Sequence, residues 1–442
     1  MKFQTILLAI FGVVAVVAVV IFSVVPVKNS SKNQGTVGAV GGVTIWGTFP
    51  STRELLKVFE IFNAGYKDSF AVNYEFHDPA VFDNDIVEAL ASGRGPDILL
   101  LPDDLVLRHS DKIELISYQS VPQVVFQSNF IQAAEIYMRD KGLIALPFAI
   151  DPMVMYWNRD LFNNASLTEP PRYWDELLTM TPKLTKRDPQ TSDIVQSAVS
   201  FGEYENVLFA KDILAMLFLQ VGNPLVAVQD GKPYSKIVTS NGKENVPAQN
   251  IVSAFRFYMD FSNPQKPNYT WGRARQNSRD EFINGNLAIY FDYASAYKPI
   301  QEKNPHLNFA VAQVPLPRGT NAEITFTKVY GLSVLKSSRN KQTAFVAVQH
   351  LLTDPLPERS FASAFDLPPV IRSYLAQPPT DSALAVFYDA AIRGRTWLDP
   401  KPEVSNKAFR RMVESVASGR NDVSIAIAIL HGDMVAALAP YQ

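Results

Sequence analysis

Strand and helix patterns alternate over the first third of the chain. Short segments predict a buried strand at 43–46, a second strand at 72–76 and a nearly continuous apolar strand at 97–101. A first helix is predicted after a capping box of Ser51 and Glu54, and its apolar residues share one face: Leu55, Leu56, Phe59 and Phe62. A second helix is predicted at 83–92 and ends at the glycines and proline of 93–96. The order β-α-β-α-β predicts a parallel α/β sheet with right-handed crossovers.

The rest of the chain is predicted to be mostly helical. Apolar spacing predicts helices at 173–184, 212–220, 247–262 and 278–284, and strands at 287–291 and 309–313. Residues 406–439 are predicted to be helical as well. Within them, the segment SIAIAIL at 424–430 also fits the alternation of a strand.

Length and composition are those of a globular protein. The chain has 442 residues, more than the roughly 250–300 residues that one hydrophobic core supports, so two lobes are expected. Lys and Arg number 41 and Asp and Glu 43, with no long run of either sign, which argues against nucleic-acid binding. The absence of cysteine excludes disulfides, thiolate nucleophiles and cysteine-ligated zinc or iron–sulfur clusters.

The N-terminus carries a long apolar segment. Residues 6–25 contain no charge, and at about 1.5 Å per residue they match the roughly 30 Å hydrocarbon core of a bilayer. This length exceeds the apolar region of most signal peptides, so an uncleaved transmembrane anchor over residues 1–27 is favoured over a cleaved signal. Residues 28–42 are polar and glycine-rich and predict a flexible linker. The flanking lysines do not decide the orientation of the span.

Candidate binding residues follow the predicted strands, because ligands of open α/β sheets bind beyond the carboxyl ends of the strands. These residues are Trp46, Gly47, Thr48, Asp78, Asp103 and Asp104. The alternative is that Trp46 belongs to the core and that the aspartates only cap the following turns. Trp397, in the loop-like sequence GRTWLDP, and Trp271 are further candidates for stacking on a ligand.

No pattern favours catalysis, a metal or a cofactor. The carboxylate pair of a glycosidase could come from Asp103, Asp104, Asp151 and Asp292. Carboxylates that accept the hydroxyls of a bound sugar look the same in a sequence, so an enzyme is not favoured. Three nearby arginines could bind an anion or could lie on a solvated helix face: Arg273, Arg275 and Arg279. The five histidines show no metal-ligand spacing, and no loop matches the EF-hand pattern.

Five segments resemble, in the right order, motifs of the extracellular solute-binding proteins of ATP-binding cassette (ABC) importers, in the maltose-binding-like branch called family 1. They are ALASGRGPD at 89–97, GLIALP at 142–147, MYWNRDLF followed by PRYWDEL within 155–177, FINGNLAIY at 282–290 and LKSSRNKQTAF at 335–345. The likeness runs over about 43–438. Each motif is weak alone, and their common order makes the resemblance specific.

The resemblance implies a periplasmic-binding-protein-like α/β fold with two discontinuous lobes joined by a hinge, here preceded by the N-terminal transmembrane helix. Crossovers between the lobes would lie at Pro147–Pro152, near Asp292–Tyr297 and near Tyr330–Val334. Residues 43–149 and 299–332 would then form the N-terminal lobe, and 150–298 and 333–442 the C-terminal lobe.

The resemblance also implies ligand-contacting residues near these crossovers: Asp151, Tyr156, Tyr293, Ser295, Tyr297 and Tyr330. Ser295 stands where the family often has a tryptophan platform, so stacking would fall to Tyr293 or Tyr297.

The implied function is binding without catalysis. A protein on the extracytoplasmic face of the cell membrane would capture a small solute, above all a mono- or oligosaccharide, and deliver it to the permease subunits of an ABC importer. The alternatives are a binding module that works without an importer, as a sensor or surface interaction protein, and a glycoside-processing enzyme.

Overall fold

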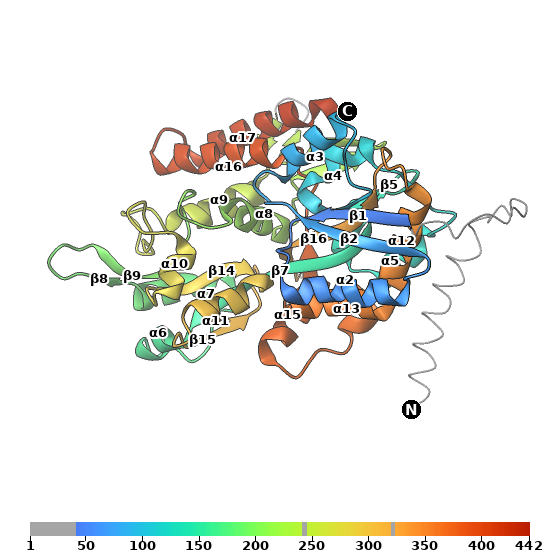
Figure 1. Ribbon diagram of the computed structural model, residues 1–442. Helices are drawn as coiled ribbons and strands as arrows, with labels where there is room; N and C mark the ends of the chain where they lie inside the picture. Colours follow the sequence, from blue (N-terminus) through green and yellow to red (C-terminus); the bar gives the residue numbers. More distant parts are fainter. Residues whose placement is uncertain (1–40, 241–244, 320–322) are drawn as a thin grey trace, which may run out of the picture. The chain divides into compact units, whose positions relative to one another are not determined.

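The computed structural model describes residues 41–240, 245–319 and 323–442 (Figure 1). The expected transmembrane segment at 6–25 and the expected linker up to residue 40 lie outside the described residues. The described chain divides into two compact units, each built from two separate stretches of sequence. Among the described residues, unit 1 contains those of 41–150 and 329–377, and unit 2 contains those of 151–328 and 378–442.

The bounds of the units differ from the expected ones after the first crossing. That crossing falls between Ile150 and Asp151, within the expected segment. The next falls after Lys328, so residues 299–328 belong to unit 2 and Asp292–Tyr297 is not a crossing. The last follows Gln377, which places 333–377 in unit 1. Two long strands, β7 (Leu146–Asn158) and β16 (Thr325–Val334), each begin in one unit and end in the other.

Unit 1 is built on a sheet with the strand order β2-β1-β3-β16. The first three strands are β1 (Gly41–Gly47), β2 (Phe70–Phe76) and β3 (Ile98–Pro102). β1 runs parallel to β2 and β3, as the alternating pattern predicted, and β16 runs antiparallel to β3. β3 is buried along its whole length, as expected for a continuous apolar strand. A separate small sheet contains β4 (Ile116–Ser117), β5 (Met138–Arg139) and β6 (Gly142–Leu143).

The first helix of unit 1, α2 (Arg53–Gly65), packs on β2. Its N-cap is Thr52, whose side chain accepts from Leu55 N. The expected capping box of Ser51 and Glu54 is therefore wrong, because the helix begins one residue later. Leu56, expected on the apolar face, is 43% exposed. The other helices of this unit are α3 (Phe82–Ala91), α4 (Val106–His109), α5 (Gln123–Asn129), α12 (Lys341–Thr353), α13 (Pro355–Ala364) and α14 (Arg372–Leu375).

Unit 2 is built on a sheet in which β7 lies between β15 (Phe309–Ala312) and β14 (Leu287–Tyr293). β9 (Ile194–Val199) pairs in parallel with β14, and β8 (Lys186–Arg187) pairs with β9. β14 is buried throughout. The shorter strands are β10 (Val226–Gln229), β11 (Lys232–Ser235), β12 (Val238–Ser240), β13 (Asn245–Pro247) and β17 (Gly394–Arg395).

The C-terminal helices α16 (Pro402–Ala417) and α17 (Val423–Leu438) lie side by side in unit 2 (Figure 1). The segment SIAIAIL is thus helical, and its residues Ala426, Ile427 and Leu430 are buried. By length and apolar composition alone, one helix of the described chain, Val423–Tyr441, could cross a membrane. The remaining helices are α6 (Arg159–Asn164), α7 (Trp174–Leu184), α8 (Ala210–Gln220), α9 (Gln249–Asp260), α10 (Ser278–Ile283), α11 (Tyr297–Lys303) and α15 (Ser382–Arg393).

Candidate functional site

In unit 1, the half-buried indole of Trp46 is held from two sides at the end of β1. Its Nε1–H donates to Glu75 Oε2 at 2.7 Å, and its ring centroid lies 4.0 Å from that of His77. His77 follows β2, and its Nδ1 is 2.7 Å from Asp85 Oδ2 in α3. Neither ring is fully buried. The pair therefore presents an aromatic surface whose orientation is set by the protein itself.

Gly47, next to Trp46, is required by packing. A Cβ at this position would lie 2.8 Å from the Tyr74 hydroxyl oxygen and 3.2 Å from Leu100 Cβ. The same hydroxyl accepts from Phe49 N and donates to Phe49 O, at 3.0 and 2.8 Å, and so fixes the loop that contains half-buried Thr48. The structure thus explains Gly47 without a ligand.

The end of β3 places Asp103 and Asp104 at the same sheet edge as Trp46. Asp103 is buried and accepts from Val329 N at 3.2 Å, and Asp104 is half-buried. Half-buried Tyr330 stands opposite Pro102 in the ladder between β16 and β3. Trp46, the two aspartates and Tyr330 therefore gather at one edge of the unit 1 sheet.

Asp78, unlike Asp103 and Asp104, is exposed and caps a turn. Its side chain is exposed, and Oδ1 accepts from Ala80 N at 2.9 Å. This is the turn-capping role that the alternative interpretation of the aspartates predicted.

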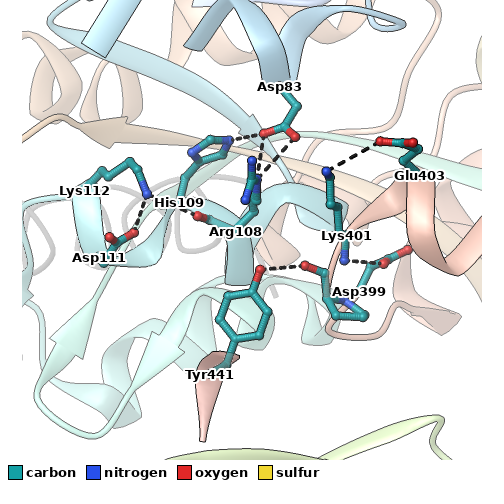
Figure 2. A network of polar contacts seen from close by, with 10 residues as sticks. Asp83, Arg108, His109, Asp111, Lys112, Asp399, Lys401, Glu403 and Tyr441 are labelled. Atoms are coloured by element: carbon teal, nitrogen blue, oxygen red, sulfur yellow. Dashed lines mark hydrogen bonds and ion pairs between the residues drawn. The ribbon is translucent and has the colours of Figure 1, made fainter. Parts of the chain in front are cut away.

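A second histidine–aspartate pair lies in unit 1 (Figure 2). His109 is fully buried, and its Nε2–H donates to Asp83 Oδ1 at 2.7 Å. This hydrogen bond lowers the pKa of the Asp83 carboxyl, with a smaller contribution from Arg108, whose Nε lies 3.3 Å from both carboxylate oxygens. Sequence reasoning missed the pair because Asp83 and His109 are 26 residues apart and share no motif.

In unit 2, three hydrogen bonds fix the turn that follows β14. Tyr156 donates to the Tyr293 carbonyl at 2.7 Å, and Tyr293 donates from its own hydroxyl to Asp212 Oδ2 at 2.6 Å. Ser295 N–H donates to Asp151 Oδ1 at 3.0 Å. Tyr156 is fully buried, so it supports the turn from the core, whereas Ser295 is half-buried and reaches the surface.

Asp151, the first residue of unit 2, is a buried carboxyl with few compensating partners. Burial raises its pKa to about 6, and the hydrogen bonds with Ser295 and the positive charge of Lys328 limit the rise. Tyr297, two residues after Ser295, is half-buried and packs edge-on against Phe309, with ring centroids 5.5 Å apart.

Two residues that sequence reasoning missed stand beside this turn. Phe209, half-buried at the N-cap of α8, has a left-handed backbone with φ of +60° and ψ of +30°. Its ring meets that of Tyr293 edge-on, with centroids 4.8 Å apart. The ammonium of half-buried Lys328 lies 4.9 Å from the Phe209 centroid and 4.6 Å from the Tyr293 centroid. No local sequence signal joins these residues, since β16, β14 and α8 bring them together.

Trp397 is mostly buried, with 5% of its surface exposed. Lys211 Nζ lies 5.9 Å from its ring centroid and forms a 2.7 Å ion pair with Asp399 Oδ2. The same carboxylate oxygen accepts from Ser405 Oγ at 2.7 Å. Its other oxygen accepts from Lys401 N at 3.0 Å, as Figure 2 shows. The loop that carries Trp397 is thus tied to α8 and α16.

For Trp271 and the three nearby arginines, the structure favours a structural role. Trp271 is fully buried, and its indole N–H donates to Asn206 Oδ1 at 3.0 Å, so it is a core residue. Each of the three arginines has a carboxylate partner: Arg273 pairs with Glu203, Arg275 with Glu281 and Arg279 with Asp292. Their charges are therefore neutralised within the protein.

Comparison with known proteins decides the family. Residues 49–355 match the family of bacterial extracellular solute-binding proteins. The chain belongs to this family. The predicted resemblance is thereby confirmed.

Relatives agree with this assignment. A Deinococcus radiodurans protein named "Probable ABC transporter-binding protein" is 23% identical over 324 residues, which cover 72% of this chain and 74% of that protein. The sugar-binding protein MalE of Xanthomonas citri has the same fold, with a TM-score of 0.71, 19% identity and coverage of 90% of this chain and 98% of that one. A solute-binding protein of Thermotoga lettingae, solved with α-D-tagatose, matches with a TM-score of 0.68 and 16% identity. The match covers 90% of this chain and 100% of that one.

The family and its structural relatives are substrate-binding proteins and not enzymes. The structural relatives also confirm the expected periplasmic-binding-protein-like α/β fold. Among residues 41–240, 245–319 and 323–442, no group of three metal-ligating side chains is placed to hold an ion. What the solute-binding protein offers in each unit is instead an aromatic surface beside hydrogen-bonding groups.

Proposed function

We propose that this solute-binding protein captures a carbohydrate on the extracytoplasmic face of the membrane and delivers it to the permease of an ABC importer. The observation that carries the proposal is the combination, in each unit, of half-buried rings with polar groups that the protein holds in place. In unit 1 these are Trp46 and His77, and in unit 2 they are Phe209 and Ser295. Sugars are bound by rings that stack on their apolar faces and by polar groups that bind their hydroxyls.

The carbohydrate class is further supported by the structural relatives, since one binds α-D-tagatose and another is named a sugar-binding protein. Delivery to an importer is supported by the name of the Deinococcus relative. Of the candidates that the sequence suggested, we retain as proposed solute contacts Trp46, Thr48, Asp103, Asp104, Asp151, Ser295, Tyr297, Tyr330 and Trp397. Tyr293 acts through its ring, while Gly47, Asp78 and Tyr156 serve the fold or a turn.

Membrane attachment is proposed from the sequence alone. The 20 uncharged residues of 6–25 would span the bilayer, and the polar residues that follow would tether the folded units close to it. A short tether raises the effective concentration of loaded protein at a permease in the same membrane.

The test is direct binding to the detergent-solubilised full chain. A thermal-shift screen would cover D-tagatose, D-glucose, D-galactose, maltose and maltotetraose, with leucine and a dipeptide as non-sugar controls. A ligand that binds only the folded state stabilises it by roughly 4 kcal/mol at about 1,000 times its Kd. An upward shift with one or more sugars, followed by isothermal titration calorimetry without consumption of the sugar, is the expected result. A shift with the amino acid or peptide alone would refute the carbohydrate assignment.

A further inference from the structure

The rings of Phe209 and Tyr293 form an aromatic corner in unit 2, and the positive charge of Lys328 lies against it. The Lys328 ammonium lies 4.6 Å from the Tyr293 ring centroid and 4.9 Å from that of Phe209. These distances are those of cation–π contacts, in which the negative faces of the rings attract the cation. Among the described residues, the structure gives this ammonium no ion pair with a carboxylate. Its three N–H donors are therefore available at a half-buried position.

The corner is built rather than incidental. Phe209 adopts the left-handed backbone region, which is costly for a bulky residue and persists only where the surroundings impose it. The Tyr293 ring is held by its hydrogen bond to Asp212 and by the contact of Tyr156 with its carbonyl oxygen. The Phe209 backbone and the Tyr293 hydroxyl are thus held by contacts that do not involve Lys328.

The charges around the corner nearly balance. Arg279 also lies within 6.0 Å of the Phe209 centroid, but its charge is matched by Asp292. Lys211 is matched by Asp399. Lys328 is left to face the carboxylate of Asp151, and the Asp212 carboxylate accepts from the Tyr293 hydroxyl. Without the ammonium, the carboxylate of Asp151 would lose its nearby positive charge.

We infer that Lys328 determines the charge class of the solute. With its ammonium against both rings, the corner accepts an uncharged polyhydroxy compound, whose oxygen atoms accept from Nζ. A cationic group is repelled because the place for a cation is already filled. Removal of the ammonium leaves two aromatic rings and the carboxylate of Asp151, which together can attract an ammonium group of a ligand. This inference rests on the proposed function, because it assigns the selectivity of the same solute site.

The experiment compares the wild-type chain with Lys328→Met, which removes the charge and keeps most of the side-chain volume. Lys328→Arg keeps the charge. Lys298→Met, at an exposed position of α11 in the same unit, is the matched control. Each full-length variant is titrated calorimetrically with three matched pairs of hexose and hexosamine: glucose, galactose and mannose with their 2-amino counterparts. Thermal melting verifies that each variant is folded.

The expected result is that Lys328→Met raises the ratio of hexosamine to hexose affinity by about tenfold for at least one pair. Lys328→Arg and Lys298→Met should leave the ratio within about twofold of wild type. An unchanged ratio in folded Lys328→Met, or an absence of any binding to it, overturns the inference. If the wild type binds no sugar while Lys328→Met gains hexosamine binding, the cation place is supported and the proposed carbohydrate function fails.

Discussion

The buried ion pair between Lys211 and Asp399 allows a quantitative test of how unit 2 holds its Trp397 loop. The side chains are 10% and 1% exposed, and Nζ and Oδ2 are 2.7 Å apart. We predict that Lys211→Met destabilises the protein by about 3 kcal/mol, at the lower end of the roughly 3–5 kcal/mol typical when one partner of a buried pair is removed. The lower end is expected because Ser405 Oγ and Lys401 N still donate to Asp399.

The matched control is Lys407→Met, which removes an ion pair of almost the same length. Lys407 Nζ and Glu403 Oε1 are 2.6 Å apart, but these side chains are 73% and 60% exposed. Exposed pairs contribute about 0–1 kcal/mol, because water screens the charges and both side chains lose freedom. The two variants therefore differ in burial and hardly in geometry.

The assay is differential scanning calorimetry of the full chain, with urea denaturation followed by circular dichroism. A loss of about 3 kcal/mol lowers the melting midpoint of a unit of this size by roughly 6–12 °C. The double variant Lys211→Met/Asp399→Asn should recover part of the loss, because no unpaired charge then remains buried. Equal losses for Lys211→Met and Lys407→Met would refute the argument that burial makes the difference.

Three further predictions concern unit 1 and the N-terminus. Burial raises the pKa of the Glu358 carboxyl to about 7 from the ordinary 4.5, so the folded state loses stability as the pH rises between these values. We therefore expect Glu358→Gln to stabilise the protein by about 3 kcal/mol at pH 8 and hardly at all at pH 4. Equal effects at both pH values in urea titrations would contradict this. Gly47→Ala should cost about 1–3 kcal/mol, since its Cβ would clash with Tyr74; Gly65→Ala, with nothing within 4 Å, is the control for the same melting experiment. Deletion of residues 1–27 should move the protein from the washed membrane fraction to the soluble fraction, as detected by immunoblot, and its retention in the membrane fraction would count against the anchor.

Some features of unit 1 follow directly from local sequence. The apolar run at 97–101 became the buried strand β3, and the alternation of strands and helices became a parallel arrangement around β1. Continuous apolar segments leave the backbone few alternatives, because both of their faces must be covered. Local pattern defines helix boundaries less well. Thr52, and not Ser51, is the N-cap of α2, because neighbouring serine and threonine hydroxyls can each satisfy the free N–H groups at a helix start.

The candidate site divides in the same way. Local sequence could nominate aromatic and acidic residues near strand ends, and Trp46 and Asp103 are among those that the fold places there. It could not distinguish Ser295, which reaches the surface, from Tyr156, which is fully buried, because both belong to apolar stretches near the expected hinge. Burial of a side chain depends on what packs against it from distant parts of the chain.

The sequence by itself determined the family, the two-unit α/β architecture and the expectation of binding without catalysis, because motif order and hydrophobic periodicity are local properties that persist along the chain. Only the tertiary structure decided where the chain passes between units, which arginines are neutralised, and that Lys328 lies against both Phe209 and Tyr293. Ion pairs and cation–π contacts act over a few ångströms in space. Residues more than a hundred positions apart therefore meet only when the strands and helices that carry them have packed.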